Sequence, residues 1–155
     1  MEDGGEGLKF LADNMLGRLA RYMRILGYDT SYPNIQAPDL VLVEMSRKED
    51  RILISRDKQL HERWKNSFLI TSDKLDDQLC QITERFHPSM QSLFSRCTAC
   101  NGLLVQPYAP CVEKYYRGDV KEVQQCDTCG KCYWRGTHTQ SIVGYLRRLG
   151  IYIES

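Results

Sequence analysis

Short apolar runs alternate, in the first half of the chain, with segments whose apolar positions recur every three or four residues. The runs are typical of buried strands, and the recurring positions are typical of amphipathic helices. Strands separated by helices at this spacing predict βαβ units and a mostly parallel sheet flanked by helices. The expected strands are residues 8–12, 28–32, 51–55 and 68–71, and the expected helices are residues 14–26, 39–48, 58–65 and 73–86.

Local signals refine two of these segments. Gly27 stands where a left-handed residue commonly ends a helix. Residues 33–38 are expected to form a loop, because a proline stands at each end. The helix at 39–48 has an apolar LVLV core, which leaves a strand possible there.

The texture of the chain changes after Pro88. Helical periodicity disappears, and Cys, Gly, Pro and Tyr dominate until about residue 136, before a last helical stretch, TQSIVGYLRRLG, at 139–150. We therefore predict an α/β domain over residues 8–88 and a small module that includes the C-terminal helix over residues 95–150.

Composition narrows the class of protein. The 155 residues are 42% hydrophobic, enough for one core with a small appended module. No apolar run approaches the ~20 residues of a membrane helix, and no signal-peptide pattern begins the chain. We therefore expect no membrane partner, and the acidic, Gly-rich leader MEDGGEG is expected to be a disordered tail. The net charge of +1 identifies no partner.

Cysteines are concentrated near the C-terminus, where six of the seven follow residue 96. Most stand in CxxC pairs, which favours metal binding over a secreted disulfide scaffold. The same observation predicts an intracellular location, cytoplasmic or nuclear, where thiols stay reduced. Cys80 and Cys111 stand outside the pairs and are expected to be packing residues.

The pairs CTAC and CDTCG match a structural zinc site with four thiolate ligands, Cys97, Cys100, Cys126 and Cys129. Cys132 is an alternative ligand, because it forms a further CxxC with Cys129; Gly130, in the usual knuckle position, favours Cys126. Gly102 and Gly130 follow the knuckles, where the turns are expected to need a positive φ. Four thiolate ligands leave no open position on the ion for a catalytic water. The alternative to a zinc site is that these cysteines are ordinary buried thiols.

Aspartates recur near the ends of the expected strands. Asp13 follows the first strand, Asp57 follows RILIS, and Asp73 follows FLIT, while Asp39 begins a helix after the second strand. The carboxyl ends of parallel strands meet at one edge, so these groups can converge there on Mg²⁺ or Mn²⁺ and act on a phosphodiester. Each Asp could instead be a helix N-cap, which is the commoner role for a single Asp between a strand and a helix.

Three motifs in order, FLADNMLGRLARYMRILGYDT, the run from Asp39 to SRD, and CYWRGTH, resemble the Mut-seven C-terminal RNase domain family. The resemblance implies a PIN-like nuclease domain fused to a zinc ribbon, and a metal-dependent ribonuclease. It places the catalytic Mg²⁺ or Mn²⁺ on Asp13, Asp39 and Asp57, with Asp73 as a looser fourth acid and Glu44 as a substitute for Asp39. Family members occur alone or at the C-terminus of longer exonuclease-domain proteins.

Basic and aromatic residues supply candidate contacts to RNA, which we expect to be single-stranded. Arginines recur every three residues along the first helix, and YWRGTH combines rings with cations, as RNA-binding surfaces do. A solvated helix face and ribbon packing are the alternatives. The candidates are Arg18, Arg21, Arg24, Arg56, Trp134, Arg135, Thr137 and His138.

Two other functions fit parts of the sequence. A non-catalytic RNA-binding module could position substrate for a nuclease domain in a larger protein. A phosphoacceptor signalling domain also gathers Asp at strand ends, but it leaves the paired cysteines unexplained. The oligomeric state does not follow from the sequence.

Overall fold

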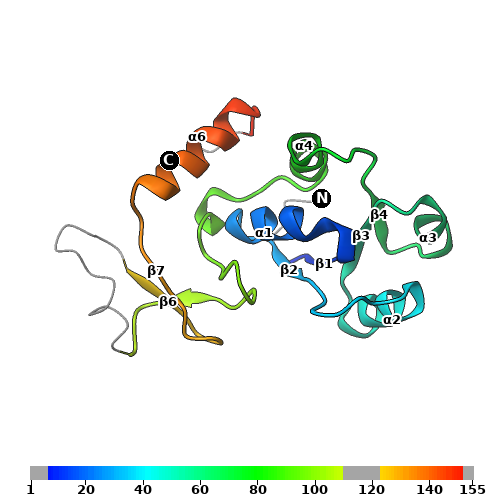
Figure 1. The fold of residues 1–155 in the computed structure, drawn as a ribbon, viewed down its shortest axis with the longest axis horizontal. Helices are drawn as coiled ribbons and strands as arrows, with labels where there is room; N and C mark the ends of the chain where they lie inside the picture. Colours follow the sequence, from blue (N-terminus) through cyan, green and yellow to red (C-terminus); the bar gives the residue numbers. More distant parts are fainter. Residues whose placement is uncertain (1–6, 110–122, 152–155) are drawn as a thin grey trace.

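The computed structural model describes residues 7–109 and 123–151, and Figure 1 shows a parallel sheet flanked by helices beside a smaller antiparallel sheet. This confirms the predicted α/β class. The larger sheet has the order β2-β1-β3-β4. Its strands are β1 (Lys9–Ala12), β2 (Asp29–Ser31), β3 (Ile52–Ser55) and β4 (Ser67–Leu69). The surrounding helices are η1 (Asn14–Leu16), α1 (Gly17–Ile25), α2 (Asp39–Glu49), α3 (Lys58–Arg63) and α4 (Leu75–Arg85).

Alternate residues of the central strands are buried on opposite faces of this sheet, because side chains alternate along a strand. Phe10 and Ile54 belong to a large apolar cluster with α1 and α4. Leu11 belongs to a second cluster with Leu42 of α2 and Leu60 of α3. Helices thus cover both faces, and α2 confirms the helix predicted for segment 39–48 over the strand that its apolar core left possible.

The first predicted helix is divided into a 3₁₀ turn, η1, and α1. A Cβ on Gly17 would lie 3.0 Å from the hydroxyl oxygen of Tyr32, so glycine lets that ring approach α1. Gly27 ends the helical segment with φ +95°, as predicted. A Cβ there would also lie 2.3 Å from the backbone oxygen of Ser92, in the turn η2 (Met90–Ser92). The chain beyond α4 is therefore seated directly on Gly27.

The smaller sheet has the order β5-β6-β7, with β5 (Leu104–Val105), β6 (Gln124–Cys126) and β7 (Cys132–Tyr133). The two edge strands lie in the sequence segments LLVQPY and CYWRG. The central strand, QQC, was not predicted, because it lacks an apolar pattern and follows a long connection. Cys111, predicted to be a packing residue, lies outside the described residues.

The last helix, α6 (Thr137–Arg148), begins two residues earlier than predicted. The hydroxyl of Thr139 accepts a hydrogen bond from the backbone N–H of Gly136 (3.0 Å), which caps the helix. Ile142 and Leu146 join the same apolar cluster as Phe10, so α6 completes the core of the larger sheet. Among the described residues, no helix is both long and apolar enough to cross a membrane.

Candidate functional site

Three of the predicted acids, Asp13, Asp39 and Asp57, line one open hollow of about 430 Å³ together with Asn14 and Arg56. The hollow lies beyond the carboxyl ends of β1 and β3, which are neighbours in the sheet. From β1 the chain goes to β2 on one side and then crosses to β3 on the other. This is the switch point at which open α/β sheets bind ligands.

Asp13 is held firmly at the end of β1 and is only 7% exposed. Its Oδ1 accepts a hydrogen bond from the backbone N–H of Met15 (2.9 Å), so the N-cap role is present. Its Oδ2 accepts a hydrogen bond from the hydroxyl of Ser55 (2.7 Å). The Ser55 oxygen in turn accepts one from the backbone N–H of Asp57 (2.9 Å). These bonds fix the ends of β1 and β3 relative to each other.

Ser55 is fully buried and was not among the predicted site residues. It stands in the SRD motif, at the end of an otherwise apolar strand. A buried hydroxyl needs a partner, and a polar residue in that position is a sequence signal that could have identified it.

The other two acids are more exposed and also have structural contacts. Asp57 is the N-cap of α3, where its Oδ1 accepts hydrogen bonds from the backbone N–H groups of Gln59 (2.9 Å) and Leu60 (3.2 Å). Asp39 begins α2, and its Oδ2 pairs with Arg63 at 3.1 Å. No described residue donates a hydrogen bond to Asp57 Oδ2 or to Asp39 Oδ1. Asp57 and the half-buried Asp39 thus each keep one oxygen to which no described residue donates.

Asn14 places the loop that carries Asp39 beside Asp13. Its side-chain amide donates to the backbone oxygen of Ile35 (2.6 Å) and accepts from the backbone N–H of Ala37 (3.0 Å). Asn14 therefore fixes the loop itself. Because Asn14 directly follows Asp13, the loop that it holds brings Asp39 to the same hollow as Asp13.

The carboxylates share the hollow without converging on one point. In the part of the chain that the structure describes, only four cysteines form a group of three or more His, Cys, Asp or Glu side chains placed to hold one metal ion. Asp73 is exposed before α4 and is not among the residues that line the hollow. Glu44, the substitute for Asp39, is exposed and pairs with Arg47.

The four predicted cysteines, Cys97, Cys100, Cys126 and Cys129, form that group, and their sulfur atoms all lie within 4.8 Å of one another. The Cys97–Cys129 and Cys100–Cys126 sulfur distances are 3.7 and 3.4 Å. A tetrahedral ion with Zn–S bonds of ~2.3 Å places its sulfurs about 3.8 Å apart. The cluster is therefore compatible with a zinc site, and it contains Cys126 rather than Cys132.

The two knuckles reach this geometry differently. Gly130 has φ +81°, as predicted. In the first knuckle, Asn101 takes the positive φ of +76°, so the prediction for Gly102 is wrong. Gly102 is instead needed for space, because a Cβ there would lie 2.6 Å from the sulfur of Cys126.

The Cys97 thiol has a lowered pKa. Burial opposes its ionisation, but hydrogen bonds from the Tyr133 hydroxyl and the backbone N–H groups of Cys100 and Ala99 outweigh burial. Together they lower the pKa of Cys97 to about 7. Metal ions bind the thiolate form, so the surroundings of Cys97 favour a ligand, whereas burial raises the pKa of the neighbouring Cys100 thiol.

The arginines of α1 do not form one exposed row. Arg18 and Arg21 are exposed, but Arg24 is only 7% exposed. Its guanidinium donates to the backbone oxygen of Thr30 in β2 (2.8 Å) and to that of Thr98 in the first knuckle (2.9 Å). Burial lowers the pKa of this guanidinium, and the two contacts join the first knuckle to the sheet, a structural role that the sequence did not predict.

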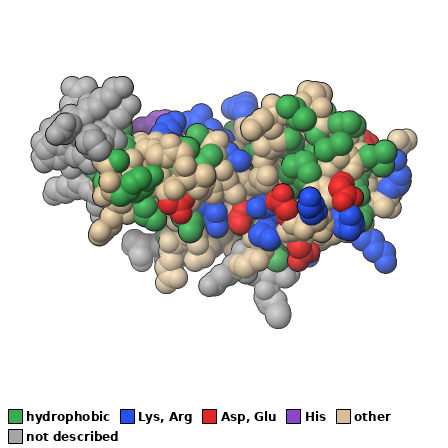
Figure 2. All heavy atoms as spheres, turned by 90° about the horizontal axis from the view of Figure 1, so that it is seen from below, with side chains coloured by type: hydrophobic (Ala, Val, Ile, Leu, Met, Phe, Trp, Pro, Cys, Tyr) green, Lys and Arg blue, Asp and Glu red, His purple; other side chains and the backbone are tan. Residues whose placement is uncertain are grey.

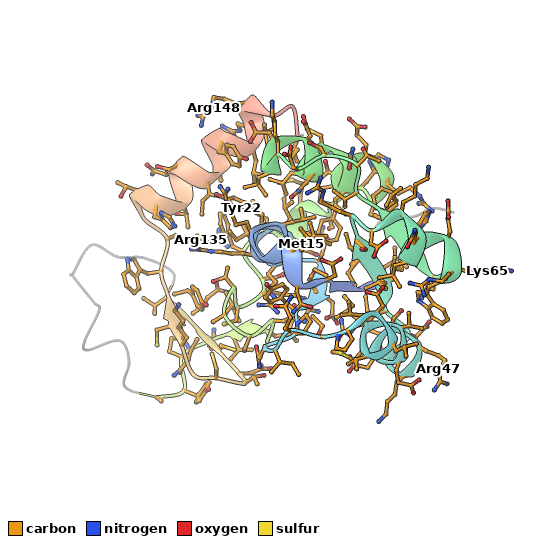
Figure 3. The ribbon with its side chains drawn as sticks, turned by 45° about the vertical axis from the view of Figure 1, so that its right-hand side comes forward. Met15, Tyr22, Arg47, Lys65, Arg135 and Arg148 are labelled. Carbon is orange, nitrogen blue, oxygen red and sulfur yellow. The ribbon has the colours of Figure 1, made fainter. Side chains whose placement is uncertain are left out.

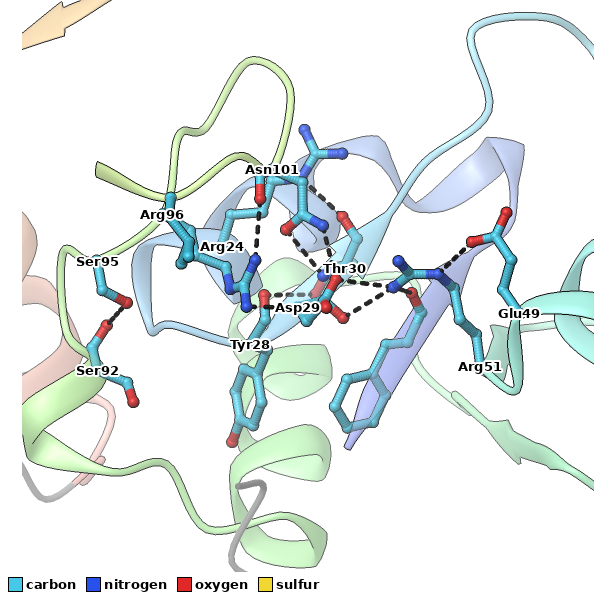
Figure 4. Close-up of polar contacts among 12 residues, drawn as sticks. Arg24, Tyr28, Asp29, Thr30, Glu49, Arg51, Ser92, Ser95, Arg96 and Asn101 are labelled. Carbon is cyan, nitrogen blue, oxygen red and sulfur yellow. Dashed lines mark hydrogen bonds and ion pairs between the residues drawn. The ribbon is translucent and has the colours of Figure 1, made fainter. Parts of the chain in front are cut away.

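Asp29 reinforces this junction (Figure 4). Its Oδ1 accepts hydrogen bonds from Arg51 (2.8 Å) and from the side-chain amide of Asn101 (2.7 Å). The Asn101 oxygen accepts one from the backbone N–H of Thr30 (3.0 Å). Burial raises the pKa of Asp29, but its bonds to Arg51 and Asn101 outweigh burial and leave that pKa lowered. Sequence reasoning missed Asp29 and Asn101, because a junction between distant segments leaves no local pattern.

Of the other predicted RNA contacts, Arg56 lines the acidic hollow, whereas those of segment 134–138 do not. Trp134, Arg135 and His138 line a separate pocket with Arg21, whereas Thr137 begins α6 outside its lining. Elsewhere, Figure 2 shows acidic and basic side chains interspersed on one face of the molecule.

One family model, the Mut7-C RNAse domain, matches the chain from residue 8 to residue 146. The matched range contains the acidic hollow, Ser55 and all four cysteines of the cluster. It confirms the resemblance inferred from the three sequence motifs. No curated protein and no solved structure gives a match to the chain.

Proposed function

Because the chain belongs to the Mut7-C RNAse domain family, we propose that it is a metal-dependent ribonuclease that hydrolyses phosphodiester bonds of RNA at the acidic hollow. The family name indicates a ribonuclease-like function and RNA as substrate. The observation that carries the proposal is the placement of Asp13, Asp39 and Asp57 around one open hollow at the switch point of the sheet.

The chemistry of the donor set suits a divalent cation. Asp13, Asp39 and Asp57 are the residues that would hold Mg²⁺ or Mn²⁺, both of which prefer carboxylate oxygens. The bound ion would activate a water and neutralise charge at the phosphate. Asp39 can turn toward the ion at small cost, because its exposed pair with Arg63 contributes less than about 1 kcal/mol.

The surrounding side chains prepare the hollow for this role. Ser55 holds Asp13 in one orientation, so one acid stays fixed while the two exposed acids adjust. Arg56 lines the same hollow and supplies a positive charge for a phosphate. Arg18, exposed on α1, is a further phosphate contact for the strand.

The cysteine cluster supports the fold rather than the chemistry. We propose that Cys97, Cys100, Cys126 and Cys129 hold one structural Zn²⁺ and that the resulting ribbon aids RNA binding. Four thiolates occupy all four coordination positions of a tetrahedral zinc ion. The bound zinc would therefore stabilise the two knuckles and, through Arg24 and Asn101, their junction with the larger sheet.

The decisive experiment measures cleavage of an end-labelled single-stranded RNA with Mg²⁺ or Mn²⁺. We expect the wild type to cleave and both Asp13→Asn and Asp57→Asn to lose more than about 100-fold in rate, since even outer-shell changes at metal sites cost 10–100-fold. The matched control is Asp50→Asn, an exposed acid at φ +54°, a conformation that Asn also adopts. Wild-type rates in both hollow variants would refute the assignment.

A non-catalytic RNA-binding module is the second candidate. It is favoured by the finding that each acid already has a capping or ion-pair contact. This function predicts RNA binding whose affinity falls with salt, together with no cleavage by the wild type with either cation.

A further inference from the structure

A second pocket, of about 110 Å³, lies where α1, the smaller sheet and α6 meet. Its walls are mostly apolar and come from all three parts of the chain. Ile25 belongs to α1, Leu104 to β5 and Ile142 to α6. The rings of Tyr133 and Trp134 complete the lining, and Trp134 is 40% exposed. An apolar pocket with accessible rings suits a flat aromatic ligand.

Arginine side chains and a histidine stand at the border of this pocket. Arg21 and His138 line it and are exposed, so both can meet an anion at its mouth. The guanidinium of Arg135 lies over the ring of Phe94, 5.2 Å from its centroid. Figure 3 shows Arg135 beside α1, on the segment that leads into α6. The pocket thus combines a ring-binding interior with a cationic border.

The interior also offers polar groups at defined places. Gln124 contributes an amide that can both donate and accept, and Thr98 contributes a hydroxyl 3.3 Å from the hydroxyl of Tyr133. A nucleotide has the matching features: an aromatic ring, hydrogen-bonding edges and an attached anion. Amide and hydroxyl groups beside stacking rings are the means by which proteins hold unpaired bases.

The size of the pocket limits what can enter it. An enclosed apolar cavity of about 150 Å³ accommodates benzene. The pocket of about 110 Å³ is smaller than this but is open at its mouth, so one ring can enter without being fully enclosed. A single base fits this description, and a stack of bases does not.

Helix α1 connects this pocket to the acidic hollow. Asp13 precedes the 3₁₀ turn η1 and Arg21 lies in the middle of α1, so the two are on the order of 13 Å apart along this segment at about 2.0 and 1.5 Å per residue. We propose that the pocket receives one base of a single-stranded RNA, with the adjacent phosphate on Arg21, while another part of the strand lies at the hollow. The identity of the strand rests on the function proposed above.

The two tryptophans of the chain make this proposal testable by NMR. Trp134 lines the pocket, whereas the indole N–H of Trp64 donates to Ser46 (2.9 Å) in a different cluster. The zinc-loaded protein is titrated with a uridine oligonucleotide, without Mg²⁺ or Mn²⁺, and both indole N–H signals are followed. We expect the Trp134 signal to shift and the Trp64 signal to stay in place. A Trp134→Phe variant assigns the two signals.

An abasic oligonucleotide of the same length separates base binding from phosphate binding. We expect it to bind about five- to 150-fold more weakly, the range for one stacked base, and to leave the Trp134 signal unmoved. Arg21→Gln is expected to weaken binding and to lower the salt dependence by about one phosphate contact. Arg148→Gln, an exposed arginine outside the pocket lining, should match the wild type.

Equal shifts of Trp134 with the normal and abasic strands would overturn the base pocket, as would no shift in a protein that binds the RNA. The cleavage experiment reports on the other proposal independently. A shift of Trp134 in a protein that never cleaves would support the base pocket and refute the nuclease. Cleavage without a shift of Trp134 would support the nuclease and refute the base pocket.

Discussion

The cysteine cluster and the acidic hollow were both expected from residues that recur at a spacing, yet they differ in how complete they are. The four sulfur atoms already lie within 4.8 Å of one another. The carboxylates of Asp13, Asp39 and Asp57 line a common hollow without such convergence. The fold brings the four sulfur ligands of the cysteine cluster together, whereas the carboxylates of the acidic hollow line it without meeting at one point.

The difference follows from what else each side chain does. In a knuckle, a short turn places two sulfurs together, and hydrogen bonds to Cys97 favour the thiolate. Asp13 and Asp57 are also helix N-caps, so backbone N–H groups compete with a metal ion for their oxygens. Closed coordination suits an ion that stabilises a fold, whereas exposed donors with open oxygens suit a site that exchanges ions and substrate.

The largest effect is expected from Cys97→Ser. Removing one thiolate should abolish stoichiometric zinc and lower the free energy of unfolding by on the order of 5 kcal/mol, a part of the 10–16 kcal/mol typical of structural zinc. Metal analysis and thermal unfolding measure the two effects. Cys80→Ser is the control, because Cys80 is half-buried outside the cluster. Full zinc content in Cys97→Ser would mean that the cluster is not a metal site.

The next effect tests the junction between the two regions. Asp29→Asn should lower the free energy of unfolding by about 2–3 kcal/mol at pH 7, because charged hydrogen bonds to Arg51 and Asn101 are lost. The lowered pKa of Asp29 means that this stabilisation is complete above its ordinary pKa of about 4 and is lost as pH falls through the lower, folded-state pKa. Denaturant unfolding of both proteins from pH 7 downward measures the difference, which should shrink in acid. A difference that stayed constant with pH would contradict this account.

Ser55→Ala is expected to lower the rate of RNA cleavage by about 10–100-fold, as loss of an outer-shell partner does at metal sites. The physical reason is that Asp13 would lose the hydrogen bond that fixes its Oδ2. Ser72→Ala, at an exposed turn before α4, is the control. Rates are compared at saturating RNA. An unchanged rate in Ser55→Ala would show that the orientation of Asp13 does not matter to catalysis.

The smallest effect is expected from Arg63→Gln. Its pair with Asp39 is exposed on both sides, so stability should fall by less than about 1 kcal/mol. Without the arginine, Asp39 is free to turn toward the hollow, and the concentration of Mn²⁺ needed for half-maximal cleavage should fall slightly. Arg47→Gln, which breaks the similarly exposed pair with Glu44, should leave that concentration unchanged. A rise in Arg63→Gln would assign the arginine a direct role.

The sequence predicted most elements of the larger sheet, because alternating apolar runs and amphipathic helices are local patterns. It also predicted Gly27 and the four cysteines, whose spacing alone carries the information. It missed β6, since the strand QQC lacks an apolar pattern and takes its place through its partners. Gly102 was predicted for the wrong reason: its need for space depends on Cys126, far away in the sequence.

The candidate site shows the same limit. Two acids at strand ends and a third at the start of α2 could be found from their position, but their other contacts could not. Arg24 repeats the spacing of Arg18 and Arg21, and only the folded chain shows that it is buried against Thr98. The bond between Ser55 and Asp13 joins residues from two strands, so it depends on the order of strands in the sheet.

Helix α6 places Ile142 and Leu146 in the cluster built around Phe10, although the strands of the smaller sheet separate α6 from the larger sheet in the sequence. On the ribosome, strands β1 to β4 emerge well before this helix does. We therefore expect part of one face of the nascent sheet to remain uncovered until α6 has been translated. The smaller sheet is then synthesised before the core of the larger sheet is complete.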